Sequence, residues 1–172
     1  YVVQPWRFPG GDIGRLAVCG TVNDLAVCGA VPMGLALGLI ISEGFAVEEI
    51  ETILDSIARA ADEAGVKVVT GDTKVVNRGN DQDIFVSTAG VGRVATGRRV
   101  SPDLVQPGDK ILINGAIGEH GLTVMLAREM PEVHSRLTSD VAPLNGLIEH
   151  LMHVVPDVVF MRDPTRAGLA GV

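Results

Sequence analysis

The stretch from residue 47 to residue 64 has the clearest repeating pattern in the chain, and it limits what the chain can fold into. Apolar side chains recur there every three or four positions, with acidic and basic side chains between them. The pattern predicts an amphipathic helix over Val47–Ala64, which Gly65 ends as a residue in the left-handed conformation. Apolar runs at 33–41 and 66–70 lie on either side of this helix and predict strands.

A second helix is predicted earlier in the chain, over residues 13–29, with Asp12 as its N-cap. It is apolar around almost its whole circumference, so we expect it to be buried on most sides. With a short entry strand at 1–3 and a longer strand at 84–94, the element order becomes β-α-β-α-β-β. This order predicts an α+β domain with a ferredoxin-like arrangement.

A turn-rich and charged stretch at 101–109 is typical of a linker. The elements predicted after it are strands at 110–114 and 158–161 and helices at about 122–129 and 143–155. We therefore predict two domains, the first over residues 1–98 and the second, an α/β unit, over residues 108–172.

The composition argues against several classes of protein. Apolar residues make up 47% of the chain, which is typical of a folded globular protein rather than a disordered one. The net charge of −7 and the aromatic content of 3% argue against a nucleic-acid partner, so a bound nucleotide would need a local device or a metal ion. No apolar stretch approaches the ~20 residues of a membrane span, and no basic segment precedes an apolar one, so we expect neither a span nor a signal peptide.

The two cysteines indicate a cytoplasmic protein. Cys19 and Cys28 both fall in the helix predicted over 13–29, on opposite sides of it and roughly 13.5 Å apart along its axis. That separation is too large for a disulfide bond between them. Unbridged thiols are typical of the cytoplasm.

One polar motif, Gly71-Asp72-Thr73-Lys74, follows the strand predicted at 66–70. A carboxylate and a hydroxyl at the carboxyl end of a strand lie where ligands commonly bind in open sheets. Lys74 stands among apolar residues, a setting that favours its neutral amine and makes it a usable base or a phosphate contact. An Asx turn with an exposed lysine is the alternative, and spacing alone leaves both open.

A second polar motif, Asn23-Asp24, interrupts the predicted apolar helix. Burying two polar side chains there is costly unless they are paired or bind a cation. Magnesium prefers carboxylates together with water and nucleotide phosphates, which makes Asp24 a candidate ligand. The alternative is that both residues lie on an exposed strip of the helix.

Three further features carry less information. Glycines in the 9–12 loop precede a helix and suit either phosphate binding by main-chain N–H groups or a tight turn, and the loop has no P-loop motif. The turn that contains Thr165 and Arg166 presents them either to an anion or to solvent. His150 and His153 lie on one helical face, but without a third ligand nearby in the sequence we expect them to be surface residues.

Six motifs occur in the order known from one family. They are FPGGDIG (8–14), TVNDLAVCGA (21–30), ISEGF (41–45), VTGDTKVV (69–76), GEHG (118–121) and RDPTRAG (162–168). Together they resemble the HypE family of hydrogenase maturation proteins, within the superfamily of aminoimidazole ribonucleotide synthetase and selenophosphate synthetase. The resemblance runs over essentially the whole chain, and GDTKVV and TVNDLA are far more specific than a glycine loop.

The resemblance implies a PurM-like N-terminal domain that binds ATP and dimerises, followed by the start of a PurM-like C-terminal α/β domain. It also implies an ATP-dependent carbamoyl dehydratase. ATP phosphorylates the oxygen of a carbamoyl group held as a thiocarbamate on a C-terminal cysteine, and loss of phosphate and a proton leaves a thiocyanate, the source of cyanide ligands for the [NiFe]-hydrogenase iron. The chemistry is reasonable because an amide oxygen leaves poorly until it is phosphorylated, and a base must take the N–H proton.

By the same resemblance, Asp24 and Asp72 hold Mg²⁺ and the ATP phosphates, and Lys74 assists the dehydration. Because two carboxylates in apolar surroundings need a cation, we expect Asp24 and Asp72 to approach each other and line one acidic site. The other residues expected to bind the nucleotide are Asp12, Asn23, Thr73, Thr165 and Arg166.

The implied partners are a second copy of the chain in a homodimer, the carbamoyltransferase HypF and the HypC–HypD complex, with no nucleic acid and no membrane. Ala167 stands where the family turn has a glycine, and neither cysteine is the C-terminal carrier. We expect that carrier, and an acidic motif before Tyr1, to lie outside this chain, which alone would be inactive. The alternatives are another ATP-using synthetase of the superfamily and a non-catalytic maturation scaffold.

Overall fold

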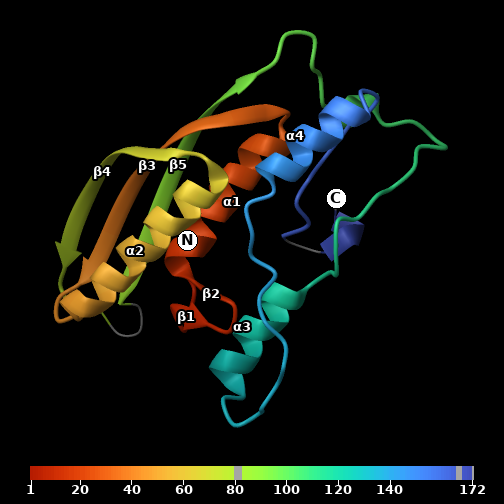
Figure 1. The fold of residues 1–172 in the computed structure, drawn as a ribbon. Helices are drawn as coiled ribbons and strands as arrows, with labels where there is room; N and C mark the ends of the chain where they lie inside the picture. The colour runs from red at the N-terminus through yellow and green to blue at the C-terminus, as the bar shows by residue number, and fades with distance from the viewer. Residues whose placement is uncertain (80–82, 166–167, 172) are drawn as a thin grey trace.

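A sheet covered on one face by two helices forms the first half of the chain. The computed structural model of the protein describes residues 1–79, 83–165 and 168–171. Its strands are β1 (Arg7–Phe8), β2 (Gly11–Asp12), β3 (Ala30–Ser42), β4 (Lys67–Val76) and β5 (Ile84–Val94), and its helices are α1 (Ile13–Val27), α2 (Val47–Ala64), α3 (Glu119–Glu129) and α4 (Asn145–Val154), with 3₁₀ turns at Pro102–Leu104 and Gly168–Gly171 (Figure 1).

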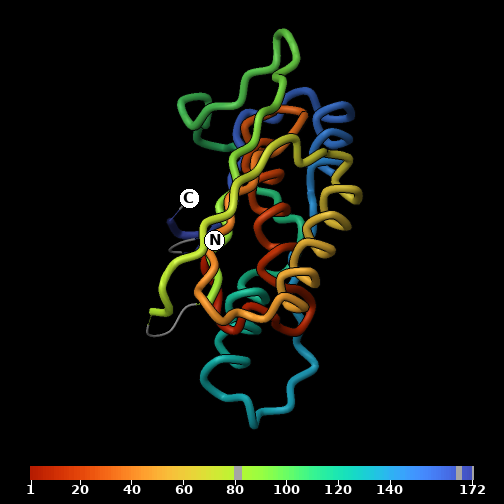
Figure 2. The backbone as a smooth tube through the Cα atoms, turned by 90° about the vertical axis from the view of Figure 1, so that its left-hand side faces the viewer, coloured from red at the N-terminus to blue at the C-terminus, as the bar shows by residue number. Residues whose placement is uncertain are grey.

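The main sheet has the strand order β4-β3-β5, with β3 in the centre (Figure 1). β3 and β4 are parallel and are connected through α2, whereas β3 and β5 are antiparallel. Helices α1 and α2 lie on the same side of this sheet (Figure 2). Leu39 and Ile41 of β3 therefore face the helices and are buried, while Ile40 between them is 42% exposed on the other side. One face of the sheet belongs to the core and the other is open.

Helix α1 lies at the centre of the core. Its residues Ile13, Val18 and Val22 have no exposed surface, because the helix packs against β3, β5, α2 and α4. The prediction of burial on most sides is confirmed, and so is the N-cap, since Asp12 Oδ1 accepts from the main-chain N–H of Arg15 at 2.9 Å. The burial of an almost wholly apolar helix requires covering elements on every side.

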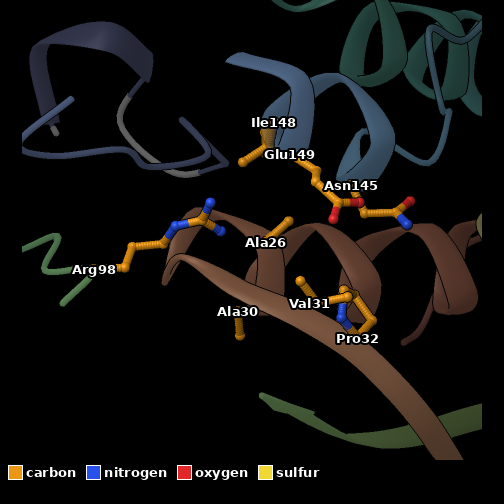
Figure 3. Close-up of a pocket in the computed structure, with 8 residues that line it drawn as sticks. All are labelled: Ala26, Ala30, Val31, Pro32, Arg98, Asn145, Ile148 and Glu149. Atoms are coloured by element: carbon orange, nitrogen blue, oxygen red, sulfur yellow. The ribbon is translucent and has the colours of Figure 1, made fainter. Parts of the chain in front are cut away.

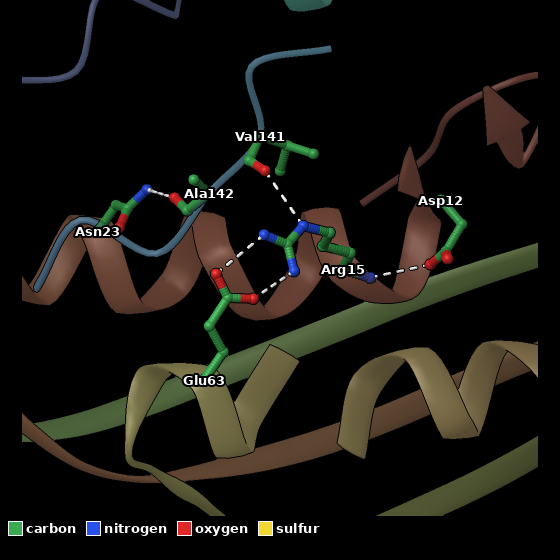
Figure 4. Close-up of polar contacts among 6 residues, drawn as sticks. All are labelled: Asp12, Arg15, Asn23, Glu63, Val141 and Ala142. Atoms are coloured by element: carbon green, nitrogen blue, oxygen red, sulfur yellow. Dashed lines mark hydrogen bonds and ion pairs between the residues drawn. The ribbon is translucent and has the colours of Figure 1, made fainter. Parts of the chain in front are cut away.

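One of these covering elements comes from far along the chain. Residues 139–144, which we call the strap, run along α1 just before α4 begins. Its first residue, Ser139, donates its main-chain N–H to the carbonyl of Pro9 at 2.8 Å, and Arg15 Nε donates to the Val141 carbonyl at 3.1 Å. The strap thus joins the second half of the chain to the start of α1 (Figure 4).

The predicted elements of the first half are largely confirmed. Helix α2 and strand β5 have the predicted bounds, and Gly65 has the left-handed conformation, with φ +69°. Helix α1 ends two residues earlier than predicted, and β3 is longer than the predicted 33–41 at both ends. The predicted order stands except for its first strand.

Two strand predictions in this half are wrong. Residues 1–3 do not form a strand, although the main chain of Tyr1 exchanges hydrogen bonds of 2.5 and 3.1 Å with Val86 of β5. Strand β4 continues to Val76 instead of ending at residue 70, because nine of its residues stay paired with β3. The Gly71-to-Lys74 motif therefore lies inside an edge strand rather than after its end.

The second half has helices close to those predicted, but its predicted strands are absent from the part of the chain that the structure describes. Residues 110–114 and 158–161 have no strand partner there. Ile111 and Leu112 are accordingly 79% and 80% exposed. A strand needs a neighbouring strand to satisfy its main-chain groups, and an apolar sequence alone does not supply one. Within the described ranges, no helix has the length and apolar character that crossing a membrane requires.

Candidate functional site

Asp24 is the predicted site residue with the most informative surroundings. It lies near the end of α1 and is exposed, as the exposed-strip alternative predicts for this residue. Partial desolvation nevertheless raises the pKa of its carboxyl group, and the negative charge of Asp163 raises it further. Asp163 comes from the other half of the chain, in the RDPTRAG motif. The structure thus brings two carboxylates, one from each half, within electrostatic reach of each other.

A partly buried chain of hydroxyl groups lies one helical turn from Asp24. The Tyr1 hydroxyl is 3.3 Å from Thr21 Oγ1, which is 2.6 Å from Thr88 Oγ1 on β5. Burial raises the pKa of Tyr1, and the charges of Asp24 and Asp163 add to this rise. The charges of Asp24 and Asp163 therefore both act on the Tyr1 hydroxyl group.

Sequence reasoning missed Asp163 as a partner of Asp24. The only signal was its motif, in which we singled out Thr165 and Arg166 rather than the acidic residue. Thr165 is exposed, and no hydrogen bond is found for it in the described part of the chain. Arg166 and Ala167 lie outside the described residues.

Asp72, Thr73 and Lys74 are displayed along the edge strand β4. In the pairing with β3, Asp72 lies opposite Gly38 and Lys74 lies opposite Ile40. Since paired residues point to the same side of a sheet, both side chains belong to the open face. Thr73 alternates to the other side.

The apolar setting expected for Lys74 is not found in a single chain. Lys74 and its neighbours Asp72 and Thr73 are all exposed, and Asp72 Oδ1 accepts the main-chain N–H of Thr73 at 2.9 Å. An edge strand with nothing packed on its open face leaves such side chains in water. Any desolvation of Lys74 would have to come from another molecule.

The expectation that Asp24 and Asp72 line one site is wrong for the single chain. Asp24 belongs to α1, which packs on the covered face of the sheet, whereas Asp72 points from the open face. The sheet separates the two carboxylates. The sequence could not reveal this, because the side on which each residue lies depends on the register of β4 against β3.

Two other predicted nucleotide ligands are engaged in the fold itself. Asp12 caps α1, as described above. Asn23 is bound at both ends of its carboxamide. Its Nδ2 donates to the Ala142 carbonyl at 3.0 Å (Figure 4), and its Oδ1 accepts from the Leu144 N–H at 2.7 Å. Both residues hold the main chain in place.

The strap also packs closely against the glycine loop before α1. Gly10 has φ +88°, and a Cβ there would lie 2.7 Å from the main-chain nitrogen of Ser139. Glycine is therefore needed for both the turn and the close approach. This supports the tight-turn interpretation of the loop over the phosphate-binding one.

His120, in the GEHG motif, holds the other side of the strap. Its Nδ1 is 2.9 Å from Ser139 Oγ, its main-chain N–H donates to Asp140 Oδ1 at 3.2 Å, and its ring meets the edge of Phe8. Burial lowers the pKa of His120, and the charge of Asp140 partly offsets this. The motif thus has a structural use in this chain.

No other part of the described chain offers a competing metal centre. Among the described residues, no group of three or more His, Cys, Asp or Glu side chains is arranged to hold a metal ion, and His150 and His153 are exposed, as expected. A small pocket lies between α4 and the start of β3, near Arg98 (Figure 3). It contains none of the predicted site residues.

Comparison with known proteins identifies the family of the chain. The model of the AIR synthase related protein N-terminal domain matches residues 1–94, and that of the C-terminal domain matches residues 106–172. The chain belongs to the AIR synthase related family. Within this family it is similar to the carbamoyl dehydratase HypE of Azotobacter vinelandii, with 48% identity over 98% of this chain and 50% of the relative.

Two solved structures match almost the whole chain. A HypE–HypF complex gives a TM-score of 0.94 at 53% identity, over 99% of this chain and 56% of the solved one. A hydrogenase maturation protein HypE in complex with ATP gives 0.94 at 47% identity, over 99% and 51%. The resemblance to HypE drawn from the motifs is confirmed. The chain spans about half the length of the curated relatives it matches.

Proposed function

We propose that the protein to which this chain belongs is an ATP-dependent carbamoyl dehydratase that serves hydrogenase maturation. The observation that carries the proposal is the convergence of Asp24 and Asp163 from the two family regions of a chain 48% identical to a carbamoyl dehydratase. Asp24, whose pKa the charge of Asp163 raises, forms with Asp163 a donor set that suits a divalent cation with nucleotide phosphates. The substrate is a carbamoyl group on a C-terminal cysteine, dehydrated there to thiocyanate.

In this proposal Asp24 and Asp163 hold Mg²⁺ at the ATP phosphates. When bound, the ion neutralises phosphate charge and makes the terminal phosphate easier to transfer. Asp72 contacts the phosphates from the open sheet face, and Thr73, on the other side of the strand, stays a candidate for contact with the nucleotide. Thr165 and Arg166 stay candidates for contact with the anion.

We further propose that two copies of the chain complete the site. Asp24 and Lys74 lie on opposite sides of one sheet, so one site can combine them only if the open face of a second copy approaches Asp24. That face exposes Ile40, Phe85 and Val91, apolar side chains that a sheet-to-sheet contact would bury. The contact would also remove Lys74 from water.

Lys74 is the proposed base. An amine held in a desolvated interface takes the carbamoyl N–H proton as phosphate leaves, and the remaining electron pair forms the nitrile. Asp12 and Asn23, which the fold already engages, are not part of this step.

HypF is the proposed donor of the carbamoyl group, because a similar chain is described in complex with HypF. The HypC–HypD complex is proposed as acceptor of the cyano group on the basis of the motif resemblance. The unbridged thiols of Cys19 and Cys28 support a cytoplasmic location.

The test uses the complete protein, carbamoylated on its terminal cysteine. We expect ATP with Mg²⁺ to bind, and the cysteine adduct to lose the mass of one water with stoichiometric release of phosphate. The variant Asp24→Asn should lose both, whereas Asp55→Asn, at an exposed position of α2, should retain both. Binding of ATP without dehydration would point to another synthetase of the superfamily, and absence of binding to a maturation scaffold.

A further inference from the structure

The carboxamide of Asn23 links the two halves of the chain. Its two hydrogen bonds reach Ala142 and Leu144, about 120 positions away in the sequence. These partners present one carbonyl and one N–H group two residues apart. A carboxamide can bond to both groups, because it has one donor and one acceptor in the same plane. It thus makes the two hydrogen bonds that the main chain of a neighbouring strand would make. Neither aspartate nor leucine can make both bonds.

The residue that Asn23 holds is the last one before α4. Leu144 immediately precedes the helix, and the first helical residue, Asn145, donates from Nδ2 to the Ala64 carbonyl at the end of α2, at 2.9 Å. The start of α4 is therefore bound to both α1 and α2 by two asparagine side chains. Hydrogen bonds of this kind fix the entry point of a helix more tightly than apolar packing does.

Helix α4 leads on to the segment that contains Asp163. Beyond the helix, Val159 accepts the main-chain N–H of Ser101 at 2.9 Å, and four residues later Asp163 comes within electrostatic reach of Asp24. Asp24 directly follows Asn23 on α1. Two adjacent residues of α1 therefore have related places in the site. Asp24 is one of its carboxylates, and Asn23 holds the segment that leads to the other carboxylate, Asp163.

We propose that Asn23 is a positioning residue for the site formed by Asp24 and Asp163. By holding the strap at Ala142 and Leu144 it fixes the start of α4, and through α4 it sets where Asp163 lies relative to Asp24. The expected effect of Asn23 on metal affinity rests on the proposed function, whereas its expected effect on the position of residues 142–165 does not. Asn23 itself touches neither metal nor nucleotide in this arrangement.

The experiment measures Mn²⁺ binding to the complete protein in the presence of ATP, by electron paramagnetic resonance of free Mn²⁺. The variants are Asn23→Leu, Asp163→Asn and the double variant, with Asn77→Leu at an exposed position after β4 as the matched control. Residues that orient metal ligands typically contribute about 10–100-fold to metal affinity. We expect Asn23→Leu to weaken Mn²⁺ binding at least tenfold and Asn77→Leu to leave it unchanged.

The double variant separates positioning from general destabilisation. If Asn23 acts through Asp163, adding Asn23→Leu to Asp163→Asn produces no further loss of affinity. Losses that multiply, or an unchanged affinity in Asn23→Leu, overturn the proposal. Asn23→Ser, which removes the same pair of bonds with a smaller side chain, takes its place if the leucine variant does not fold.

Amide hydrogen exchange distinguishes a failure of this proposal from a failure of the proposed function. Asn23→Leu should speed exchange at 142–165 and leave α2 unchanged. If Asp24→Asn and Asp163→Asn both bind Mn²⁺ normally, the metal assignment is refuted, and the exchange data alone then decide the positioning role. Unchanged exchange at 158–165 in Asn23→Leu overturns it.

Discussion

Gly14 lies where α1 passes close to the main chain of α2, and replacing it with alanine should destabilise the protein. A Cβ at this position would lie 2.7 Å from the Ile53 carbonyl oxygen and 3.0 Å from Ile57 Cγ1. A main-chain oxygen cannot rotate away, so the two helices must separate. Such overpacking costs about 1–3 kcal/mol, whereas alanine in place of helical glycine stabilises by about 1 kcal/mol. The net loss of up to about 2 kcal/mol should lower Tm by up to about 8 °C.

The same substitution at Gly121 is the matched control. Gly121 lies in α3, and no atom stands within 4 Å of the position of a new Cβ. Only the helix propensity then acts, so Gly121→Ala should raise the free energy of unfolding by up to about 1 kcal/mol. Thermal unfolding of the complete protein followed by circular dichroism measures both variants. A Tm for Gly14→Ala at or above that of the wild type would refute the close-packing argument.

Three further predictions concern the site and the strap. Lys74→Ala should slow thiocyanate formation by about 10²–10⁴-fold in a single turnover while ATP still binds. Lys67→Ala, on the same strand, is the control and should behave as wild type. A near-normal rate in Lys74→Ala would exclude Lys74 as the base. Burial lowers the pKa of His120 in the folded protein below its ordinary 6.5, so the unfolded chain binds the proton more tightly and stability falls as the pH drops below about 6.5. His120→Gln should flatten the fall of Tm between about pH 7 and pH 5, and parallel curves would contradict this. Asp163→Asn should lower the pKa of Asp24, because a neighbouring negative charge is removed, and an unchanged carboxyl titration by NMR would show that the two side chains do not interact.

The elements that could be predicted from the sequence are those whose residues alone specify their boundaries. Helix α2 has one apolar stripe and a glycine after its last turn, so both ends were predictable. The length of β4 was not, because Gly71, Asp72 and Thr73 are poor strand formers. Pairing with β3 outweighs their preferences, and that pairing is a tertiary contact.

At the candidate site, too, the sequence predicted some features, whereas others depend on tertiary contacts. The sequence indicated that Asn23, as a polar side chain in an apolar helix, needs a partner, and it predicted that the partner is the nucleotide. Its actual partners, Ala142 and Leu144, are main-chain groups that no spacing in the sequence indicates. The pairing of Asp24 with Asp163 rather than with Asp72 likewise depends on how β4 and the strap lie in space. Motif residues were predictable, but their neighbours were not.

The distance in sequence between α1 and the strap has a consequence for how the protein is made. Asn23 and Leu144 are separated by 121 positions, and at about 5–20 residues per second a ribosome needs roughly 6–24 s to synthesise that interval. During this time the strap side of α1 faces water. Two polar side chains of α1, Arg15 and Asn23, lie on this side. The nascent chain therefore exposes the hydrophilic side of α1 until its cover has been translated.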